Sequence, residues 1–549
     1  MPALTVILVL FLQSDPVGLV SHARRAQAEF ERVRLLLLPA GAAGSGGRCD
    51  ARIGRFCYWS DGGDTDVPRE PAQIARERAR LLAVLDSVAL ALPGDAWVAG
   101  QRVRYQLEAG RPDAATEVAR ACRAAAWWCT ALQGLVQHVA GSYEAAERSF
   151  ETALEAMPED ERCRWNDLSD LLEEPLRRRY RRLSCGERRG FEARLWWLAQ
   201  PLWSLRGNDR RTEHYARVTM ARLLERARSP YGLWGDDERE LIVRYGWPVA
   251  WERDDGGGTR EPVSIGHDPE PSFHFVPDAQ GFDTLTLGDQ PGALYSTAAR
   301  ERYAPHYATR FTGLEPAFAR FRRGDSTIVV ASYDVAGDTS FQDPGREAAL
   351  VLERDERSSP VVTRRSGADR WGVLVAEAPW QPTFLSLELL APQHRAVARA
   401  RAPVRAPAAG GVTLSGILVF EPADSLPADL PAALARARAG GVRRGERIGL
   451  FWEAYGLAPG QDVSAAVTVT PERTSWLRRI GAALGLAPRT GSVRVEWREA
   501  AQPEQGRAAR ALVLDLKGLG AGRYRLDVTI SPPDGAPGTA TCRLDIIEP

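Results

Sequence analysis

The sequence predicts a multidomain α+β protein with a helical N-terminal half and an all-β C-terminal half. Two patterns carry this prediction. A helix–turn–helix unit recurs after 31 residues, from Trp97 to Trp128, and short alternating apolar segments separated by turns fill the chain from residue 326 onwards. Recurring helical pairs stack into a solenoid, and closely spaced alternating strands are typical of β-sandwiches. With 549 residues, the chain is long enough for about three or four domains.

The N-terminus resembles a secretory signal peptide. Residues 4–12 read LTVILVLFL, and Ser14 is a tolerable cleavage position, although no basic residue precedes the apolar run. We therefore expect residues 1–14 to be removed and the protein to be periplasmic or secreted. If the run is instead a buried first helix, the protein is cytoplasmic. No other run approaches the ~20 apolar residues that cross a bilayer, so we expect no integral membrane span.

The charges balance, with 71 Lys and Arg against 71 Asp and Glu. A nucleic-acid binder carries a net basic excess, so the composition argues against that class. No HExxH, GxSxG, Walker or EF-hand pattern is present in the sequence. His267 and His274 flank two acidic residues, but their spacing matches no metal template. We therefore expect no metal site and no cofactor.

Seven cysteines are present, and six of them fall into sequence-local pairs. An extracytoplasmic location favours disulfides within these pairs, whereas a reducing compartment would leave ordinary buried thiols. Neither CxxC spacing nor neighbouring histidines suggest a zinc or haem site. The candidate disulfides are Cys49 with Cys57, Cys122 with Cys129, and Cys163 with Cys185, which leaves Cys542 over.

Residues 20–160 are expected to form a helical repeat domain. Apolar spacing predicts helices over residues 20–40 and 70–92. Two helical hairpins then follow, in which Gly110 and Gly141 occupy the same turn position, again 31 residues apart. These units resemble tetratricopeptide repeats, whose stacked helices often bind peptides on a concave face. The alternative is that the helices only support the next domain.

Residues 161–320 are expected to hold a further helical segment and a small α/β module. Asn208 is a good N-cap, and Glu213 and Arg217 stand at i, i+4 on the helix that follows it. Strands are expected at LIVRYG, FHFVP and DTLTL, with DDGGGTREP as a loop or hairpin tip.

This region holds an aromatic pair and a proline (Trp196, Trp197, Pro201), an asparagine before a helix with Glu-His-x-x-Arg (Asn208, Glu213–Arg217), and an Arg-Tyr-Gly-x-Pro turn (Arg244–Pro248). In that order these residues resemble the GWxTD domain. The repeats, this module and the β-domains together also resemble large secreted proteins of Gemmatimonadota-type bacteria. The sequence departs from the family pattern at Leu233, where the first glycine belongs, and at Asp236, where threonine belongs. The resemblance implies an architecture and brings no activity with it. The matching motif residues, which we expect to be structural, are Trp196, Trp197, Pro201, Asn208, Glu213, His214, Arg217, Trp234, Asp237, Arg244, Tyr245, Gly246 and Pro248, with Trp251 beside them.

Two polar groups in this module could carry chemistry. Residues 236–240 hold four carboxylates, but adjacent exposed acids do not give the two different environments that acid–base catalysis needs. Asp237 and Glu240 have the spacing of a capping box instead. Glu213, His214 and Arg217 could cluster with Arg244 and Glu252, either as a site or as a buried structural network.

The three large aromatic residues of the module are expected to be core. We expect Trp234, Tyr245 and Trp251 to be mostly buried and to contact the helix that begins near Asn208. Gly246 should permit a positive φ in the turn before Pro248.

Two β-sandwiches are expected at residues 321–403 and 410–549, or else one large two-sheet body. The whole pattern favours a non-catalytic extracytoplasmic scaffold or protein-binding protein of the bacterial cell envelope, with another protein or a peptide as its partner. The alternatives are a hydrolase-like enzyme with a site at the helical–β junction, and a carbohydrate-binding protein that uses exposed tryptophans.

Overall fold

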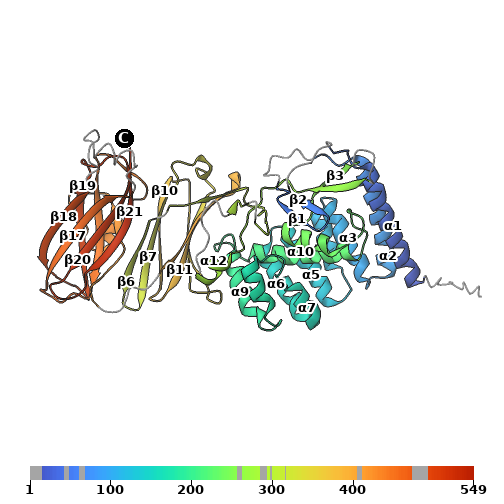
Figure 1. The fold of residues 1–549 in the computed structure, drawn as a ribbon, viewed down its shortest axis with the longest axis horizontal. Helices are drawn as coiled ribbons and strands as arrows, with labels where there is room; N and C mark the ends of the chain where they lie inside the picture. The colour runs from blue at the N-terminus through green and yellow to red at the C-terminus, as the bar shows by residue number, and fades with distance from the viewer. Residues whose placement is uncertain are drawn as a thin grey trace, which may run out of the picture. The chain divides into compact units, whose positions relative to one another are not determined.

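The structure is a computed structural model. It describes residues 15–41, 49–60, 68–255, 262–284, 294–296, 299–315, 317–404, 411–472 and 492–548. The chain divides into two compact units (Figure 1). The first unit ends at Thr309; the second begins at Arg310 and also takes in Leu202–Ser204. Residues 1–14, where a signal peptide is predicted, lie outside the described residues.

The first unit begins with two long helices and two helical hairpins. The turns of the hairpins contain Gly110 and Gly141, with φ of 67° and 73°, a backbone conformation that glycine adopts at no steric cost. The apolar faces of the first helices meet in one core that contains Phe30, Leu85 and Tyr105. The helices are α1 (Pro16–Leu37), α2 (Ala72–Ala91), α3 (Ala96–Glu108), α4 (Pro112–Arg120), α5 (Ala126–Val139) and α6 (Tyr143–Ala156).

The rest of the first unit surrounds one central helix, α10 (Asp209–Glu225). Asn208 caps it, because the Asn208 side chain accepts a hydrogen bond from the backbone N–H of Arg211 at 2.9 Å. Helix α10 packs against α3, α5, α6 and two of the helices that follow here. The remaining elements are α7 (Glu159–Trp165), α8 (Glu174–Arg181), α9 (Arg188–Ala199), α11 (Asp236–Tyr245), α12 (Ala279–Thr284), β1 (Ala51–Ile53), β2 (Phe56–Tyr58), β3 (Ala250–Asp254) and β4 (Val263–His267).

Two local predictions in this region are wrong: LIVRYG lies in helix α11 as far as Tyr245, and FHFVP contributes only an isolated bridge from Phe273 to Tyr303. The first two residues of DTLTL end helix α12, and its last three lie outside the described residues. A short apolar run does not distinguish a strand from a helix, and the acidic first turn of α11 favours the helix. The capping box is also absent, since Gly235 occupies the N-cap and no side chain caps the helix.

The second unit opens with a β-sandwich. One sheet has the strand order β10-β7-β6 and the other β5-β12-β11-β8-β9. Their facing side chains, among them Tyr333, Leu350 and Leu387, form a single core. Strand β6 runs across the domain boundary expected at residues 320/321. The strands are β5 (Arg310–Gly313), β6 (Ala317–Arg323), β7 (Ser326–Asp334), β8 (Glu347–Glu353), β9 (Val361–Ser366), β10 (Trp371–Pro379), β11 (Thr383–Ala391) and β12 (Ala396–Val404).

A second sandwich follows. Strand β16 pairs with β13, β14 and β19 in one sheet, and the other sheet has the order β15-β21-β20-β17-β18. Trp452 is fully buried between them. The strands are β13 (Thr413–Leu414), β14 (Leu418–Phe420), β15 (Val442–Arg443), β16 (Arg447–Tyr455), β17 (Asp462–Pro471), β18 (Val493–Ala500), β19 (Arg507–Asp515), β20 (Gly522–Ser531) and β21 (Gly538–Ile547).

The two sandwiches of this unit share contacts. Phe321 of the first and Phe451 of the second lie in one buried cluster. Arg323 donates two hydrogen bonds, of 2.7 and 2.8 Å, to the buried carboxylate of Glu453.

Among the helices that the structure describes, none is both long enough and apolar enough to cross a membrane.

Candidate functional site

The predicted Glu213–Arg217 pair forms the centre of a buried network on α10. Glu213 accepts a hydrogen bond from Arg217, and its other oxygen lies 2.6 Å from Nε2 of His138. Arg217 also donates to the backbone carbonyls of Arg244 and Arg302, both at 2.8 Å. Burial alone would raise the pKa of Glu213, but the charge of Arg217 and the bond to His138 hold that pKa far below its usual range. The network thus fixes α10 against the end of α11.

A hydroxyl, an imidazole and a carboxylate meet in this network in the order of a catalytic triad. Thr212 Oγ1 lies 2.9 Å from Nδ1 of His138, whose other nitrogen faces Glu213. A nucleophile must touch its substrate, however, and Thr212 is fully buried in the first turn of α10. Its hydroxyl also bonds to the carbonyl of Asp209 at 3.1 Å. The arrangement therefore has the elements of acyl-transfer chemistry without access for a substrate.

Asp209 lies at the first turn of α10. Its Oδ2 accepts hydrogen bonds from Tyr303 at 3.1 Å and Tyr307 at 2.9 Å. Burial raises the pKa of Asp209 to about 6, and the two tyrosine hydroxyls oppose that rise. These residues could not be recognised in the sequence, because Tyr303 and Tyr307 are distant from Asp209 along the chain and match no motif.

The other motif residues of the helical part are structural. His214 points away from Glu213, with Nε2 at 3.2 Å from the carbonyl of Trp165. Burial lowers its pKa to about 3, so the ring is neutral. Asn208 donates from its side chain to the carbonyl of Trp196 at 2.7 Å, and both Trp196 and Trp197 are buried.

The three large aromatic residues of the module differ in how completely they are buried. Tyr245 is buried as expected and stacks on Tyr58, with ring centroids 3.7 Å apart. Trp234 and Trp251 are mostly covered, although less completely than Tyr245. Trp251 packs on the core of α1, α2 and α3, with the guanidinium of Arg34 at 5.2 Å from its ring.

The remaining predicted partners lie elsewhere. Glu252 lies 3.4 Å from His267 and takes no part in the Glu213 network. Arg244 joins that network only through its backbone; its side chain pairs with Glu240 at 2.9 Å.

The turn residues of the motif lie around the ends of α11. Asp237 accepts from the backbone N–H of Arg55 at 3.2 Å. Gly246 has the predicted positive φ, 91°, and Pro248 packs so closely on Gly266 that a Cβ there would lie 2.3 Å from its ring.

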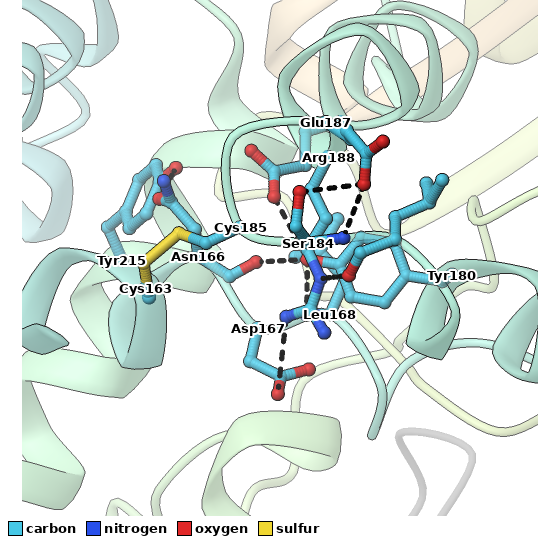
Figure 2. The surroundings of a disulfide bond; sticks show 12 residues. Cys163, Asn166, Asp167, Leu168, Tyr180, Ser184, Cys185, Glu187, Arg188 and Tyr215 are labelled. Carbon is cyan, nitrogen blue, oxygen red and sulfur yellow. Dashed lines mark hydrogen bonds and ion pairs between the residues drawn. A yellow bond between two sulfur atoms is a disulfide. The ribbon is translucent and has the colours of Figure 1, made fainter. Parts of the chain in front are cut away.

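All three predicted disulfides are present. Cys49–Cys57 and Cys122–Cys129 close short loops, and Cys163–Cys185 joins α7 to the loop before α9 (Figure 2). Cys542 is free. Disulfides persist in oxidising compartments, so the pairing fits an extracytoplasmic protein.

A carboxyl group with a perturbed pKa lies near Cys163–Cys185. Tyr180 Oη is 2.7 Å from the carbonyl of Asn166 and 2.9 Å from Oε1 of Glu192. The Tyr180 hydroxyl donates, and the Asn166 carbonyl and the Glu192 carboxyl compete for its single proton. Burial raises the pKa of Glu192 to about 7, against the hydrogen bond from Tyr180.

A small cavity lies where α3, α5 and α10 meet. Its volume is about 70 Å³, and the indoles of Trp97, Trp127 and Trp128 form its walls together with Gln101, Leu223 and Arg226. Trp97 and Trp128 begin α3 and α5, and they are the two residues that define the 31-residue repeat. The sequence therefore marked two of the three tryptophans. Leu223 and Arg226 of the α10 region could not be recognised from the sequence, because they reach the cavity only through the packing of α10 against α3 and α5.

The tryptophan side chains are held by the ends of neighbouring helices. Nε1 of Trp97 donates to the carbonyl of Arg226 at 2.6 Å, and Nε1 of Trp128 donates to the carbonyl of Ala96 at 2.9 Å. Gln101 donates to the carbonyl of Leu223 at 2.8 Å. The bonds from Trp97 and Gln101 satisfy carbonyls at the C-terminal end of α10 that the helix itself leaves open. The cavity is thus built from fixed side chains.

No protein-family model matches the chain, and no match was found among curated proteins. Among solved structures, the chain is similar to red sea bream transglutaminase, with 10% identity and a TM-score of 0.15 over 43% of this chain and 31% of the transglutaminase. It is also similar to Salmonella alpha-2-macroglobulin reacted with methylamine, with 11% identity and a TM-score of 0.21 over 45% of this chain and 25% of that one. The FN1-FN3 domains of chicken CNTN1 are 10% identical, with a TM-score of 0.14 over 43% of this chain and 68% of theirs. These likenesses carry no functional argument.

Proposed function

We propose that the chain is a non-catalytic, extracytoplasmic binding protein of the bacterial cell envelope, and that its helical unit takes up a segment of another protein. The observation that carries the proposal is the tryptophan-lined cavity between α3, α5 and α10. Tryptophan is enriched at binding hot spots because it offers a large rigid surface for burial. The three disulfides support the extracytoplasmic part of the proposal.

A binding function is favoured over hydrolysis because the polar residues that could catalyse are buried or already hydrogen-bonded to other residues. The Thr212–His138–Glu213 set is the arrangement that most resembles catalytic machinery, and its hydroxyl is fully buried. The motif residues Glu213 and Arg217 satisfy each other and nearby carbonyls. Residues that already have structural partners are not free to act on a substrate.

The architecture of the helical unit is part of the same proposal. We take the hairpins α3–α4 and α5–α6 as tetratricopeptide-like repeats and the region around α10 and α11 as a GWxTD-like module. In this view α10 covers the repeats and supplies one wall of the cavity. The sandwiches of the second unit then act as the scaffold that carries the binding unit.

Site-specific crosslinking in the native cell envelope tests the proposal. A photoreactive amino acid replaces Trp127, which is half-buried at the cavity, and in a matched strain it replaces Arg189, an exposed residue of α9. We expect a discrete protein adduct from position 127 and none from position 189, in the extracytoplasmic fraction. Equal labelling from both positions, or a protein confined to the cytoplasm with reduced cysteines, would contradict the proposal.

A further inference from the structure

The chemistry of the cavity defines the kind of ligand it fits. We infer that the cavity takes a leucine-sized aliphatic side chain of a peptide, and that Arg24 and Arg226 bind a carboxylate next to that side chain. The inference rests on the proposed function, since it names the ligand of the same cavity.

The walls of the cavity are apolar in character. The indole N–H groups of Trp97 and Trp128 are bound to the carbonyls of Arg226 and Ala96, so these tryptophans present hydrocarbon surface to the cavity. Leu223 is also buried there. Such a surface gains free energy by covering an apolar side chain and gains little from a polar one.

The size of the cavity selects among apolar side chains. Its volume is about 70 Å³, whereas an engineered apolar cavity that binds benzene measures about 150 Å³. A branched aliphatic side chain therefore fits, and an indole or phenyl ring would require the walls to move apart. Protein interiors resist such movement because they are close-packed.

Two arginines beside the cavity lack an acidic partner. Arg24 lies 4.9 Å from the ring of Trp97 and donates to the carbonyl of Arg226 at 3.4 Å. Neither Arg24 nor Arg226 forms an ion pair with any residue in the parts of the chain that the structure places. Both side chains are exposed, so a carboxylate can approach them.

The neighbouring acids are already engaged. Glu225 pairs with Arg222 at 2.7 Å, and Glu161 lies 3.6 Å from that same guanidinium. Asp95 caps α3 by accepting from the backbone N–H of Val98 at 2.9 Å. The cap bond leaves the charge of Asp95 in place, but Arg24 and Arg226 together outweigh it. The charge beside the cavity is therefore positive, which favours a peptide carboxylate and disfavours a basic peptide.

Calorimetry on the full-length, disulfide-bonded chain tests the inference with three capped peptides. The first places two aspartates after a leucine, the second replaces the aspartates by lysines, and the third replaces the leucine by glycine. We expect the first peptide to bind at least about tenfold more tightly than either of the others, and its binding to weaken as salt is added.

Arg226→Glu supplies the decisive variant, with Arg189→Glu as the matched control on an exposed surface. We expect Arg226→Glu to abolish the preference for aspartate over lysine and Arg189→Glu to preserve it. Thermal melts of both variants should match the original protein, because both arginines are exposed.

The outcomes separate this inference from the proposed function. Equal affinity for the aspartate and lysine peptides, or a preference that survives Arg226→Glu, overturns the inference and leaves the binding function in place. If no peptide binds but the position-127 crosslink persists, the ligand chemistry is wrong. A cello-oligosaccharide that binds where the peptides fail overturns the inference in favour of a carbohydrate. Absence of both crosslink and peptide binding overturns the proposed function itself.

Discussion

Removing the guanidinium of Arg217 should unfold the helical unit at a much lower denaturant concentration. Arg217→Met keeps the side-chain volume but removes the arginine partner of the buried Glu213 carboxylate, which keeps only His138, and the donor to the carbonyls of Arg244 and Arg302. Breaking one side of a buried ion pair costs about 3–5 kcal/mol, and a domain's whole stability is about 5–15 kcal/mol. We therefore expect the variant to lose at least about a fifth of the stability of the unit.

A matched exposed pair provides the control. Arg148 and Glu144 form an ion pair of 2.9 Å on α6, with side chains 65% and 49% exposed. Such pairs contribute about 0–1 kcal/mol, so Arg148→Met should change little.

Urea unfolding followed by the helical circular-dichroism signal is the appropriate assay. Nearly all of the helix in the described part of the chain belongs to the first unit. If Arg217→Met and Arg148→Met shift the unfolding midpoint equally, the network is not what fixes α10 against α11, and the reasoning fails.

Three further predictions follow from buried groups. The pKa of Glu192 rises from an ordinary 4.5 to about 7 on folding, so the folded state holds a proton that the unfolded state has lost. The free energy of unfolding should therefore fall as pH rises from about 4.5 to 7. Urea unfolding at several pH values should show this fall in the original protein and a smaller one in Glu192→Gln. Burial raises the pKa of the Cys542 thiol to about 12, so without reductant an alkylating reagent should label one thiol only after denaturation; mass spectrometry that finds two or more labelled thiols would refute the disulfide pairing. Trp196→Ala should cost about 3–5 kcal/mol because Trp196 is 3% exposed, and Trp234→Ala should cost clearly less because Trp234 is less completely buried; equal shifts in thermal melts would contradict the difference.

The sequence predicted the structure where apolar residues recur at a regular spacing. Strand β10 alternates buried and exposed positions along its length, so its pattern of two could be recognised in WGVLVAE. Strand β9 cannot be recognised in this way, because VVTRRS is mostly exposed at the edge of its sheet and carries no such alternation. The disulfides were predictable because the paired cysteines are separated by only 8, 7 and 22 residues.

The features that could not be predicted from the sequence, helix α11 and the cavity, depend on contacts between segments that are distant along the chain. LIVRYG became a helix whose terminal carbonyl, that of Arg244, accepts from Arg217, a contact that no local propensity encodes. The cavity likewise needs Leu223 and Arg226 to lie beside Trp97 and Trp128, about a hundred residues earlier in the chain. The repeat pointed to Trp97 and Trp128 but could not show that α10 lines the same cavity.

Helix α10 connects stability and binding in a way that makes them experimentally separable. Its middle carries the buried Glu213–Arg217 network, whereas its C-terminal turn contributes carbonyls that hold Gln101 and Trp97 in place. A shift of α10 by one helical turn, about 5.4 Å, would break both sets of contacts at once. The network joins α10 to α5 and α11, whereas the contacts at the cavity lie at the C-terminal end of the helix. It follows that Arg217→Met should weaken ligand binding only as far as it unfolds the unit, whereas Arg226→Glu should change binding alone.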